Sequence, residues 1–359
     1  MAIASPRGEA GSARPSHALS AAELLAWRRA MLAIEGAGDG SAVGLDWLLD
    51  LAGGIRWPAL QALWLHPQRH VQLQASLQEL ETLWRRHCLR SEPLQYLVGR
   101  CPWRDLELSV APGVLIPRQE TEQLLELALQ LAPSAPAEGP LCWADLGTGS
   151  GCLAVGLARA LPHGCGLVVD ASPEALLQAA ANLQALLPPG SLIEGPVVVD
   201  PQKPAERGQS PSPQSGVSDR LVRRVLLRQG SWWEPIASWW GRLQLVVSNP
   251  PYIPTAVLAG LDPVVRDHEP ALALDGGADG LTAIRRIVAG AGAGLAPGGL
   301  LLLEHHHDQS EAVLALLAAA GLQDCRAHRD VEGVLRFASA RRPNQSDAAA
   351  DASAGGIAP

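Results

Sequence analysis

Apolar residues in the first quarter of the chain recur at the spacing of amphipathic helices. Leu77, Leu80, Leu83, Trp84 and His87 fall on one face of a helical pattern. Two capping boxes mark helix starts: Ser20 with Glu23, and Ser76 with Glu79. We therefore predict a small helical domain over residues 19–92. Residues 1–18 are rich in Ala, Ser, Gly, Pro and Arg and are predicted to be a disordered tail.

The periodicity changes after residue 92. Gln95–Gly99 and the alternating stretch Leu106–Val110 are predicted to be the two strands of a β-hairpin linker over residues 93–116. From residue 117 to 342, helical stretches alternate with short apolar strands, which is typical of a mostly parallel sheet with ligands at its carboxyl edge. Residues 188–220 are Pro/Ser/Gln-rich and are predicted to be a flexible insertion. Residues 343–359 are predicted to be a second disordered tail.

A glycine-rich turn follows the first apolar strand of this second domain. The strand over residues 141–146 leads into Gly147, Thr148, Gly149, Ser150 and Gly151, and a helix follows. Glycines allow a tight turn and a close ligand approach to a helix N-terminus. The next strand ends in Asp170, which suits the hydroxyls of a ribose. This order predicts a site for a nucleoside-containing cofactor; the alternative is an ordinary βαβ unit.

A second motif ends the strand that begins at Leu243. Asn249-Pro250-Pro251-Tyr252 interrupts it, because two prolines remove two backbone donors. The Asn249 side-chain oxygen and the Pro250 carbonyl could each accept one hydrogen of an amide-like –NH₂, and Tyr252 could stack on a planar group. The corner therefore indicates methylation of such a nitrogen. The alternative is a Pro-Pro turn whose Asn bonds its own backbone.

Composition narrows the classes of protein. The formal net charge of −8 argues against a broad electrostatic grip on nucleic acid. The six cysteines show neither a C-x-x-C pair nor a metal-ligand spacing, which is typical of reduced intracellular thiols. No apolar run is long enough to span a bilayer, and the first residues lack a signal peptide's apolar core. We expect a cytoplasmic protein.

Five stretches together resemble the peptide chain release factor N5-glutamine methyltransferases. They are Glu92–Tyr96, Gly113–Arg118, Asp145–Gly151, Asn249–Pro254 and Glu269–Gly277. The resemblance covers roughly residues 20 to 340. It implies a Rossmann-like S-adenosylmethionine-dependent methyltransferase fold behind a helical substrate-recognition domain, and a monomer whose partner is a release factor.

The resemblance also implies roles for single residues. Gly147–Gly151 would hold the methionine part of S-adenosyl-L-methionine, Asp170 its ribose, and Trp232 would lie by the adenine. Asn249 would contact both cofactor and substrate. The substrate glutamine, which belongs to a Gly-Gly-Gln motif, would be held by Asn249, Pro250, Pro251 and Tyr252.

The chain departs from the family pattern at three places. The insertion over residues 188–220 is additional, Ser231 replaces a frequent Asp, and His305-His306-His307 follows Glu304 in place of an Ile-Gly pair. Consecutive side chains on an extended segment point to opposite faces, so we predict a solvated strand end there and no metal site. Two other functions stay open. One is methylation of an exocyclic base –NH₂ in nucleic acid, and the other is cofactor binding without catalysis.

Overall fold

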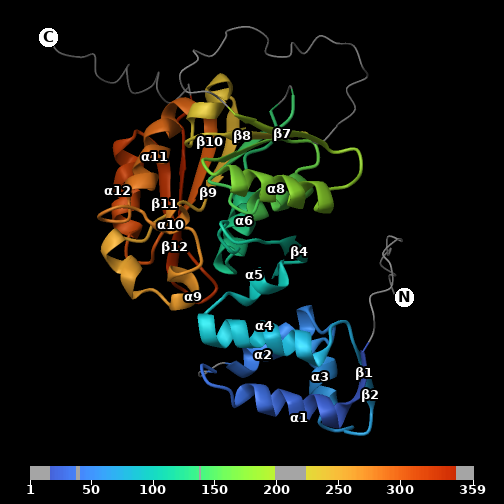
Figure 1. Ribbon diagram of the computed structural model, residues 1–359. Helices are drawn as coiled ribbons and strands as arrows, with labels where there is room; N and C mark the ends of the chain where they lie inside the picture. Colours follow the sequence, from blue (N-terminus) through green and yellow to red (C-terminus); the bar gives the residue numbers. More distant parts are fainter. Residues whose placement is uncertain (1–16, 38–40, 137–138, 199–223, 345–359) are drawn as a thin grey trace, which may run out of the picture. The chain divides into compact units, whose positions relative to one another are not determined.

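The computed structural model describes residues 17–37, 41–136, 139–198 and 224–344 (Figure 1). The chain divides into two compact units, Met1–Arg100 and Cys101–Pro359. The two predicted tails lie outside the described residues, except at their inner ends. There the prediction is corrected, because His17 and Ala18 belong to a short strand.

The first unit is mainly helical. Its helices are α1 (Ala21–Leu32), α2 (Ser41–Leu51), α3 (Trp57–Leu63), α4 (Leu77–Arg90) and α5 (Leu94–Val98). A ribbon of two antiparallel strands, β1 (His17–Ser20) and β2 (His70–Leu73), was not predicted. Both capping boxes are confirmed, since each serine hydroxyl accepts from the glutamate N–H and each glutamate accepts from the serine N–H.

The predicted hairpin exists, but its first strand was placed too early. Gln95–Val98 lies in α5, where the Leu97 N–H donates to the Pro93 carbonyl at 3.1 Å. Gly99 ends this helix with a φ of 73°, a conformation that glycine adopts without a Cβ penalty. The hairpin is instead formed by β3 (Arg100–Trp103) and β4 (Leu106–Ser109).

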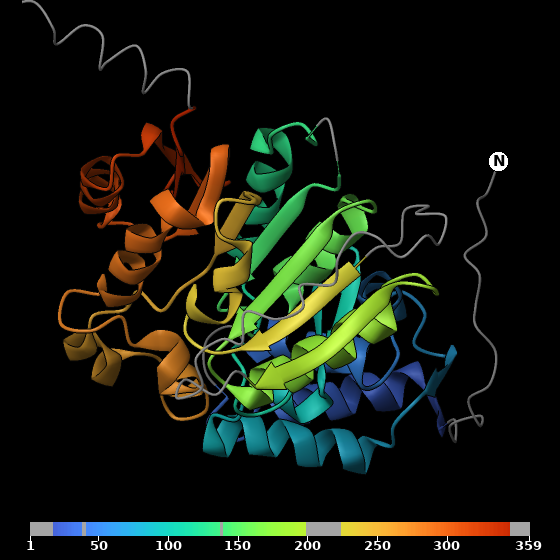
Figure 2. The same cartoon turned by 90° about the horizontal axis from the view of Figure 1, so that it is seen from above.

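The second unit is built on an eight-stranded sheet in the order β11-β12-β10-β9-β5-β6-β8-β7. Its strands are β5 (Cys142–Leu146), β6 (Cys165–Asp170), β7 (Leu192–Val198), β8 (Arg224–Gln229), β9 (Leu243–Ser248), β10 (Leu295–Glu304), β11 (Gln323–Arg329) and β12 (Leu335–Arg341). Six neighbouring strands, from β10 to β7, run parallel, and β12 pairs antiparallel with both β10 and β11. In Figure 2 the yellow strand β8 lies between β6 and β7.

Helices cover both faces of this sheet (Figure 1). Leucines of α6 (Glu120–Leu131), α7 (Cys152–Ala160) and α8 (Pro173–Leu186) share one buried cluster with the strands. Apolar residues of α11 (Thr282–Gly294) and α12 (Ser310–Ala319) share the other. Burial on both faces explains why the central strands are apolar at consecutive positions.

Shorter helical segments connect the strands near the site: η1 (Glu234–Trp239), η2 (Thr255–Gly260), α9 (Pro263–Arg266) and α10 (Ala271–Leu274). Strand order reverses at β5, which has β6 on one side and β9 on the other. The carboxyl ends of β5 and β9 therefore flank the topological switch point, where open α/β sheets place their ligands.

The predicted insertion is wrong for its first part. Leu192–Val198 forms β7, which pairs in parallel with β8 at the edge of the sheet. The register shifts between Glu194 and Val197, around Gly195-Pro196, and an edge strand tolerates a proline. Residues 199–223 lie outside the described residues. In the described part of the chain, we find no helix with the length and apolarity that a membrane crossing requires.

Candidate active site

The glycine-rich turn after β5 depends on backbone conformations that favour glycine. Gly147, Gly149 and Gly151 have φ values of 77°, 55° and 82°. The N–H groups of Gly147 and Thr148 both donate to the Val169 carbonyl at the end of β6, at 2.8 and 3.0 Å. A Cβ on Gly149 would meet no described atom within 4 Å, so this side of the turn faces open space. The turn can therefore admit a ligand at Gly149.

Asp145 lies buried beneath this turn. Its Oδ2 accepts a hydrogen bond from the Thr148 hydroxyl at 2.7 Å, whereas Oδ1 has no partner among the described residues. Burial raises the pKa of Asp145 to about 7. A buried carboxylate oxygen without a partner is costly, and a bound ligand with a donor group would satisfy it. The residues of the turn thus fit a polar cofactor.

Asp170 joins the ends of two strands. Its Oδ2 accepts from the Gly149 N–H at 2.8 Å, and its Oδ1 accepts from the Ser172 N–H at 2.9 Å. Burial raises the pKa of Asp170, and these backbone hydrogen bonds oppose the shift. Asp170 therefore already shapes the glycine-rich turn, and each oxygen retains a lone pair for a ligand hydroxyl.

Trp232, which the resemblance to the family places by the adenine of the cofactor, lies against the same turn. A Cβ on Gly147 would approach the Trp232 ring to 3.1 Å. Trp232 has a φ of 50°, in the left-handed region that bulky residues rarely adopt. The neighbouring Trp233 is buried and donates from Nε1 to the Ile287 carbonyl at 2.8 Å. Of the two adjacent tryptophans, only Trp232 is partly exposed beside the turn.

The Asn249 corner lies beside this turn at the edge of the sheet. Trp143, Ala144 and Asp145 of β5 pair with Leu245, Val246 and Val247 of β9 in parallel register. Both strands therefore end at the same edge, about 4.8 Å apart. The Ser248 hydroxyl donates to the Leu146 carbonyl at 2.6 Å and ties the two strand ends together.

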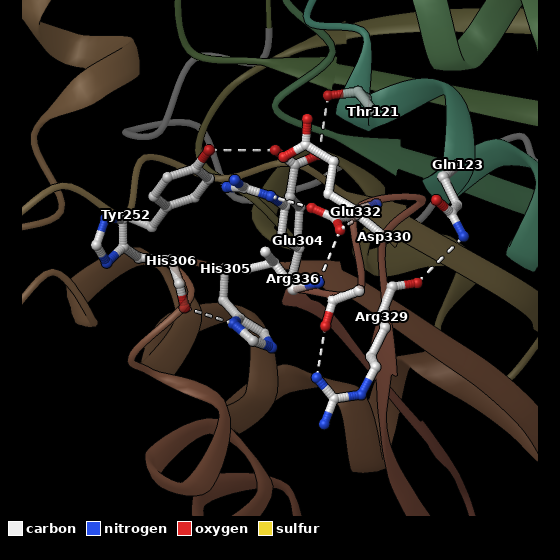
Figure 3. A network of polar contacts seen from close by, with 12 residues as sticks. Thr121, Gln123, Tyr252, Glu304, His305, His306, Arg329, Asp330, Glu332 and Arg336 are labelled. Carbon is white, nitrogen blue, oxygen red and sulfur yellow. Dashed lines mark hydrogen bonds and ion pairs between the residues drawn. The ribbon is translucent and has the colours of Figure 1, made fainter.

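Polar contacts hold the corner from two sides (Figure 3). Asn249 Nδ2 donates to Thr121 Oγ1 at 2.9 Å, and Thr121 Oγ1 donates to Glu304 Oε2 at 2.8 Å. The Tyr252 hydroxyl donates to Glu304 Oε1 at 3.2 Å. Figure 3 shows that Tyr252 and Thr121 approach the Glu304 carboxylate from different sides. Glu304 and Thr121 are buried. Since the amide nitrogen of Asn249 is occupied, its oxygen Oδ1 remains the free acceptor.

The backbone carbonyls of the corner differ in whether they accept a hydrogen bond from the chain. The Tyr252 carbonyl accepts a hydrogen bond from Gln309 Nε2 at 3.0 Å. In the described part of the chain no hydrogen bond reaches the Pro250 carbonyl. Asn249 Oδ1 and the Pro250 carbonyl are thus available as acceptors, and no hydrogen bond reaches the Asn249 and Pro251 carbonyls in the described residues either.

Sequence reasoning missed Thr121 and Glu304 as parts of the site. Glu304 ends an apolar strand, as Asp170 does, and an acidic residue in that position was the signal available for it. Thr121 lies on α6, far from the corner in the sequence, and no pattern in the sequence pointed to it.

The histidines after Glu304 do not form a uniformly solvated strand end. His305 is buried, which corrects the prediction, and its Nδ1 lies 2.8 Å from the His306 carbonyl. Burial lowers the pKa of His305. His306 Nδ1 lies 2.6 Å from Asp308 Oδ1, and His307 is exposed as expected. The described residues contain no group of three His, Cys, Asp or Glu side chains that could hold a metal ion.

A doubly wound sheet with a glycine-rich turn and an Asn-Pro-Pro-Tyr corner at its switch point defines a Rossmann-like methyltransferase. The chain is 45% identical over 324 residues to a "Release factor glutamine methyltransferase" of Prochlorococcus marinus, covering 90% of this chain and 98% of that protein. Proteins of the same name from Thermosynechococcus vestitus and Synechocystis sp. are 41% and 37% identical, over 77% and 83% of this chain and 83% and 89% of their own length. The chain belongs to the family of release factor glutamine methyltransferases.

A solved structure, "protein-(glutamine-N5) methyltransferase (release factor-specific)" from Alicyclobacillus acidocaldarius, is 25% identical. It covers 66% of this chain and 99% of its own chain, with a TM-score of 0.34. No protein-family model matches the chain.

Proposed function

We propose that this chain transfers a methyl group from S-adenosyl-L-methionine to the side-chain amide nitrogen of the glutamine in the Gly-Gly-Gln motif of peptide chain release factors. The observation that carries the proposal is the orientation of Asn249. Its Nδ2 is committed to Thr121, so Oδ1 is the atom available for an –NH₂ group. The membership of the family supports the substrate.

The residues of the glycine-rich turn suit the cofactor. Gly149 leaves space for it, Asp145 Oδ1 lacks a partner among the described residues, and the partly exposed Trp232 lies on the turn. The proposed cofactor-binding residues are Gly147, Thr148, Gly149, Ser150, Gly151, Asp170, Trp232 and Asn249. Bound there, S-adenosyl-L-methionine supplies an electrophilic methyl group.

Asn249 and Pro250 overcome the poor nucleophilicity of an amide nitrogen. Its lone pair is delocalised into the adjacent carbonyl. Asn249 Oδ1 and the Pro250 carbonyl each accept one amide hydrogen, which aims the lone pair and favours the positive charge that develops on nitrogen. Pro251 fixes the backbone of the corner, and the Tyr252 ring stacks on the planar amide. The extra proton on the methylated amide is acidic enough to leave to water, so no side-chain base is required.

The same corner would fit the exocyclic –NH₂ of a nucleic-acid base, which is the alternative substrate. The net charge of −8 weighs against it. A cofactor-binding protein without catalysis would have no use for an oriented Asn249. We place the reaction in the cytoplasm, where release factors act.

The test is methyl transfer from labelled S-adenosyl-L-methionine to purified release factor, with DNA and ribosomal RNA in parallel. A release factor whose Gly-Gly-Gln glutamine is replaced by alanine is the matched control. Label on the intact factor alone supports the proposal. Label on nucleic acid but not on the factor would overturn the substrate, and no transfer to any of them would overturn the catalytic function.

A further inference from the structure

Glu304 lies at the centre of the contacts that hold the substrate corner, although it is not part of the corner motif. β10 pairs with β9 in parallel, with Leu303 opposite Ser248. Glu304 therefore follows in register beside Asn249, on the adjacent strand. One of its oxygens accepts from Thr121 and the other from Tyr252, at 2.8 and 3.2 Å. The Glu304 carboxylate thus contacts Tyr252 of the corner directly and is linked to Asn249 through the Thr121 hydroxyl.

We propose that Glu304 is a positioning residue that sets the direction of the hydrogen bonds at the corner and thereby turns the Asn249 oxygen toward the substrate. The proposal rests on the proposed function, in which this oxygen accepts a hydrogen from the target –NH₂.

The direction follows from counting protons. Above its pKa of about 7, Glu304 is ionised and only accepts hydrogen bonds, so the Thr121 hydroxyl must then give its single proton to Glu304. Thr121 Oγ1 can then only accept from Asn249, and the group of Asn249 that donates is Nδ2. The amide oxygen Oδ1 must therefore lie on the opposite side. The direction of each hydrogen bond thus fixes the direction of the next, and the Glu304 carboxylate fixes the first.

The two ends of an asparagine amide have nearly the same shape, so shape alone does not select between them. A flipped Asn249 would present its –NH₂ to the –NH₂ of the substrate, placing donor against donor. Glu304 excludes this arrangement without touching the substrate. The same carboxylate fixes the Tyr252 ring, because it accepts from the Tyr252 hydroxyl.

The surroundings of Glu304 argue against a role in stability. In the described part of the chain no cation lies within ion-pair distance of it, and the nearby Arg336 pairs with Asp330 at 2.5 Å. Burying a carboxylate without a cation is costly. The charged or titratable groups that face it are Glu120 of α6, Cys152 of α7, Tyr252 of the corner and Arg336 of β12. Burial raises the pKa of Glu304 to about 7, and the bonds from Thr121 and Tyr252 oppose that shift.

Nuclear magnetic resonance can read the orientation of Asn249 without any substrate. The chain has three asparagines, Asn182, Asn249 and Asn344, so selective ¹⁵N-asparagine labelling yields three side-chain amides, and Asn249→Ala identifies one of them. In the wild type the Asn249 –NH₂ should exchange slowly with solvent. Glu304→Gln, whose –NH₂ can donate to Thr121 so that the direction is no longer imposed, and Thr121→Val should speed that exchange by about tenfold, the scale of one lost hydrogen bond. Thr121→Ser, which keeps the hydroxyl, should exchange at least several-fold more slowly than Thr121→Val.

Single-turnover methyl transfer with saturating cofactor measures the consequence. Glu304→Gln should lower the rate about tenfold or more, while the affinity for S-adenosyl-L-methionine, measured by calorimetry, changes less than about twofold. The double variant Glu304→Gln/Thr121→Val should be no slower than the slower single variant, because both break one chain of hydrogen bonds. Glu311→Gln, on the exposed side of α12, is the matched control and should match the wild type.

The outcomes separate the two proposals. If the wild type does not methylate the release factor, the proposed function fails, and the amide-exchange measurement still decides the role of Glu304. Unchanged exchange of the Asn249 –NH₂ in folded Glu304→Gln would overturn that role. A rate within twofold of the wild type would overturn it as well, and so would additive effects in the double variant.

Discussion

The two halves of the candidate site are built in different ways. In the cofactor half, Thr148 and Asp145 are 3 residues apart in the sequence, and Gly149 and Asp170 are 21 apart. In the substrate half, the partners of the corner are distant: Asn249 and Thr121 are 128 residues apart, and Thr121 and Glu304 are 183 apart. The cofactor half is thus formed by residues close together in the sequence, whereas the substrate half is formed by residues that only the tertiary structure brings together.

The two halves also differ in what they offer a ligand. The cofactor half offers open space at Gly149 and a carboxylate oxygen of Asp145 that has no partner among the described residues, so changes there should act on affinity. The substrate half offers two oriented acceptors, so changes there should act on the rate of the bound complex. This contrast is what the following variants test.

The largest effect is expected from Asn249→Ala. Removing one of the two acceptors should slow methyl transfer at least about 100-fold, by analogy with the loss of one oxyanion-hole donor. Asn249→Asp should fall between alanine and the wild type, because it keeps an accepting oxygen but loses the donor to Thr121. Single-turnover rates at saturating cofactor are the measurement. Near-wild-type transfer by a folded Asn249→Ala protein would sink the mechanism.

Each half contains a fully buried carboxylate with a pKa of about 7, Asp145 in one and Glu304 in the other, and both should make the free energy of unfolding depend on pH. The pKa of Glu304 is about 7 in the folded protein against 4.5 when exposed. A raised pKa means that the folded state holds the proton more tightly, so this stabilisation is complete below about pH 4.5 and is lost as the pH rises through 7. Asp145 acts with the same sign, because burial raises its pKa from 3.8 to about 7.

The Glu304→Gln variant shows how much of this pH dependence of the unfolding free energy comes from the substrate half. Between pH 4.5 and pH 8, the wild type should lose about 2–3 kcal/mol of unfolding free energy relative to Glu304→Gln. Urea denaturation at both pH values measures the difference, and the other titrating groups cancel between the two proteins. A difference that does not change with pH would show that Glu304 titrates as an exposed carboxylate.

Asp170→Ala should weaken the binding of S-adenosyl-L-methionine by about 1.5–3 kcal/mol. The variant loses a charge-assisted contact with the ribose and also the acceptor for the Gly149 N–H. Saturating cofactor should restore most of the rate, in contrast to Asn249→Ala. Calorimetry that finds wild-type affinity in a folded Asp170→Ala protein would remove this residue from the cofactor half.

The smallest effect is expected from Tyr252→Phe. The ring that stacks on the substrate amide stays, and only the hydrogen bond to Glu304 is lost, so the rate should fall a few-fold. Tyr252→Ala should be much slower, because the stacking surface is gone. If both variants lose the same rate, the hydroxyl rather than the ring is what the corner requires.

The sequence by itself determined the elements whose cause is local. Ser20 and Ser76 cap their helices within three residues, and the apolar run before Asn249 is a buried strand that two prolines end. The glycine-rich turn was also predicted from the local sequence, because backbone positions with a positive φ favour glycine. Local rules failed at Gln95–Val98, where five residues between Pro93 and Gly99 form one helical turn instead of a strand.

Only the tertiary structure decided which residues hold the substrate corner. Thr121 is an ordinary residue of a first helical turn, and Glu304 is a strand-end carboxylate like Asp170. Their roles come from the order of the strands, which places β10 beside β9 and brings α6 against them. Strand order results from packing both faces of the whole sheet, and no short window of sequence contains that information.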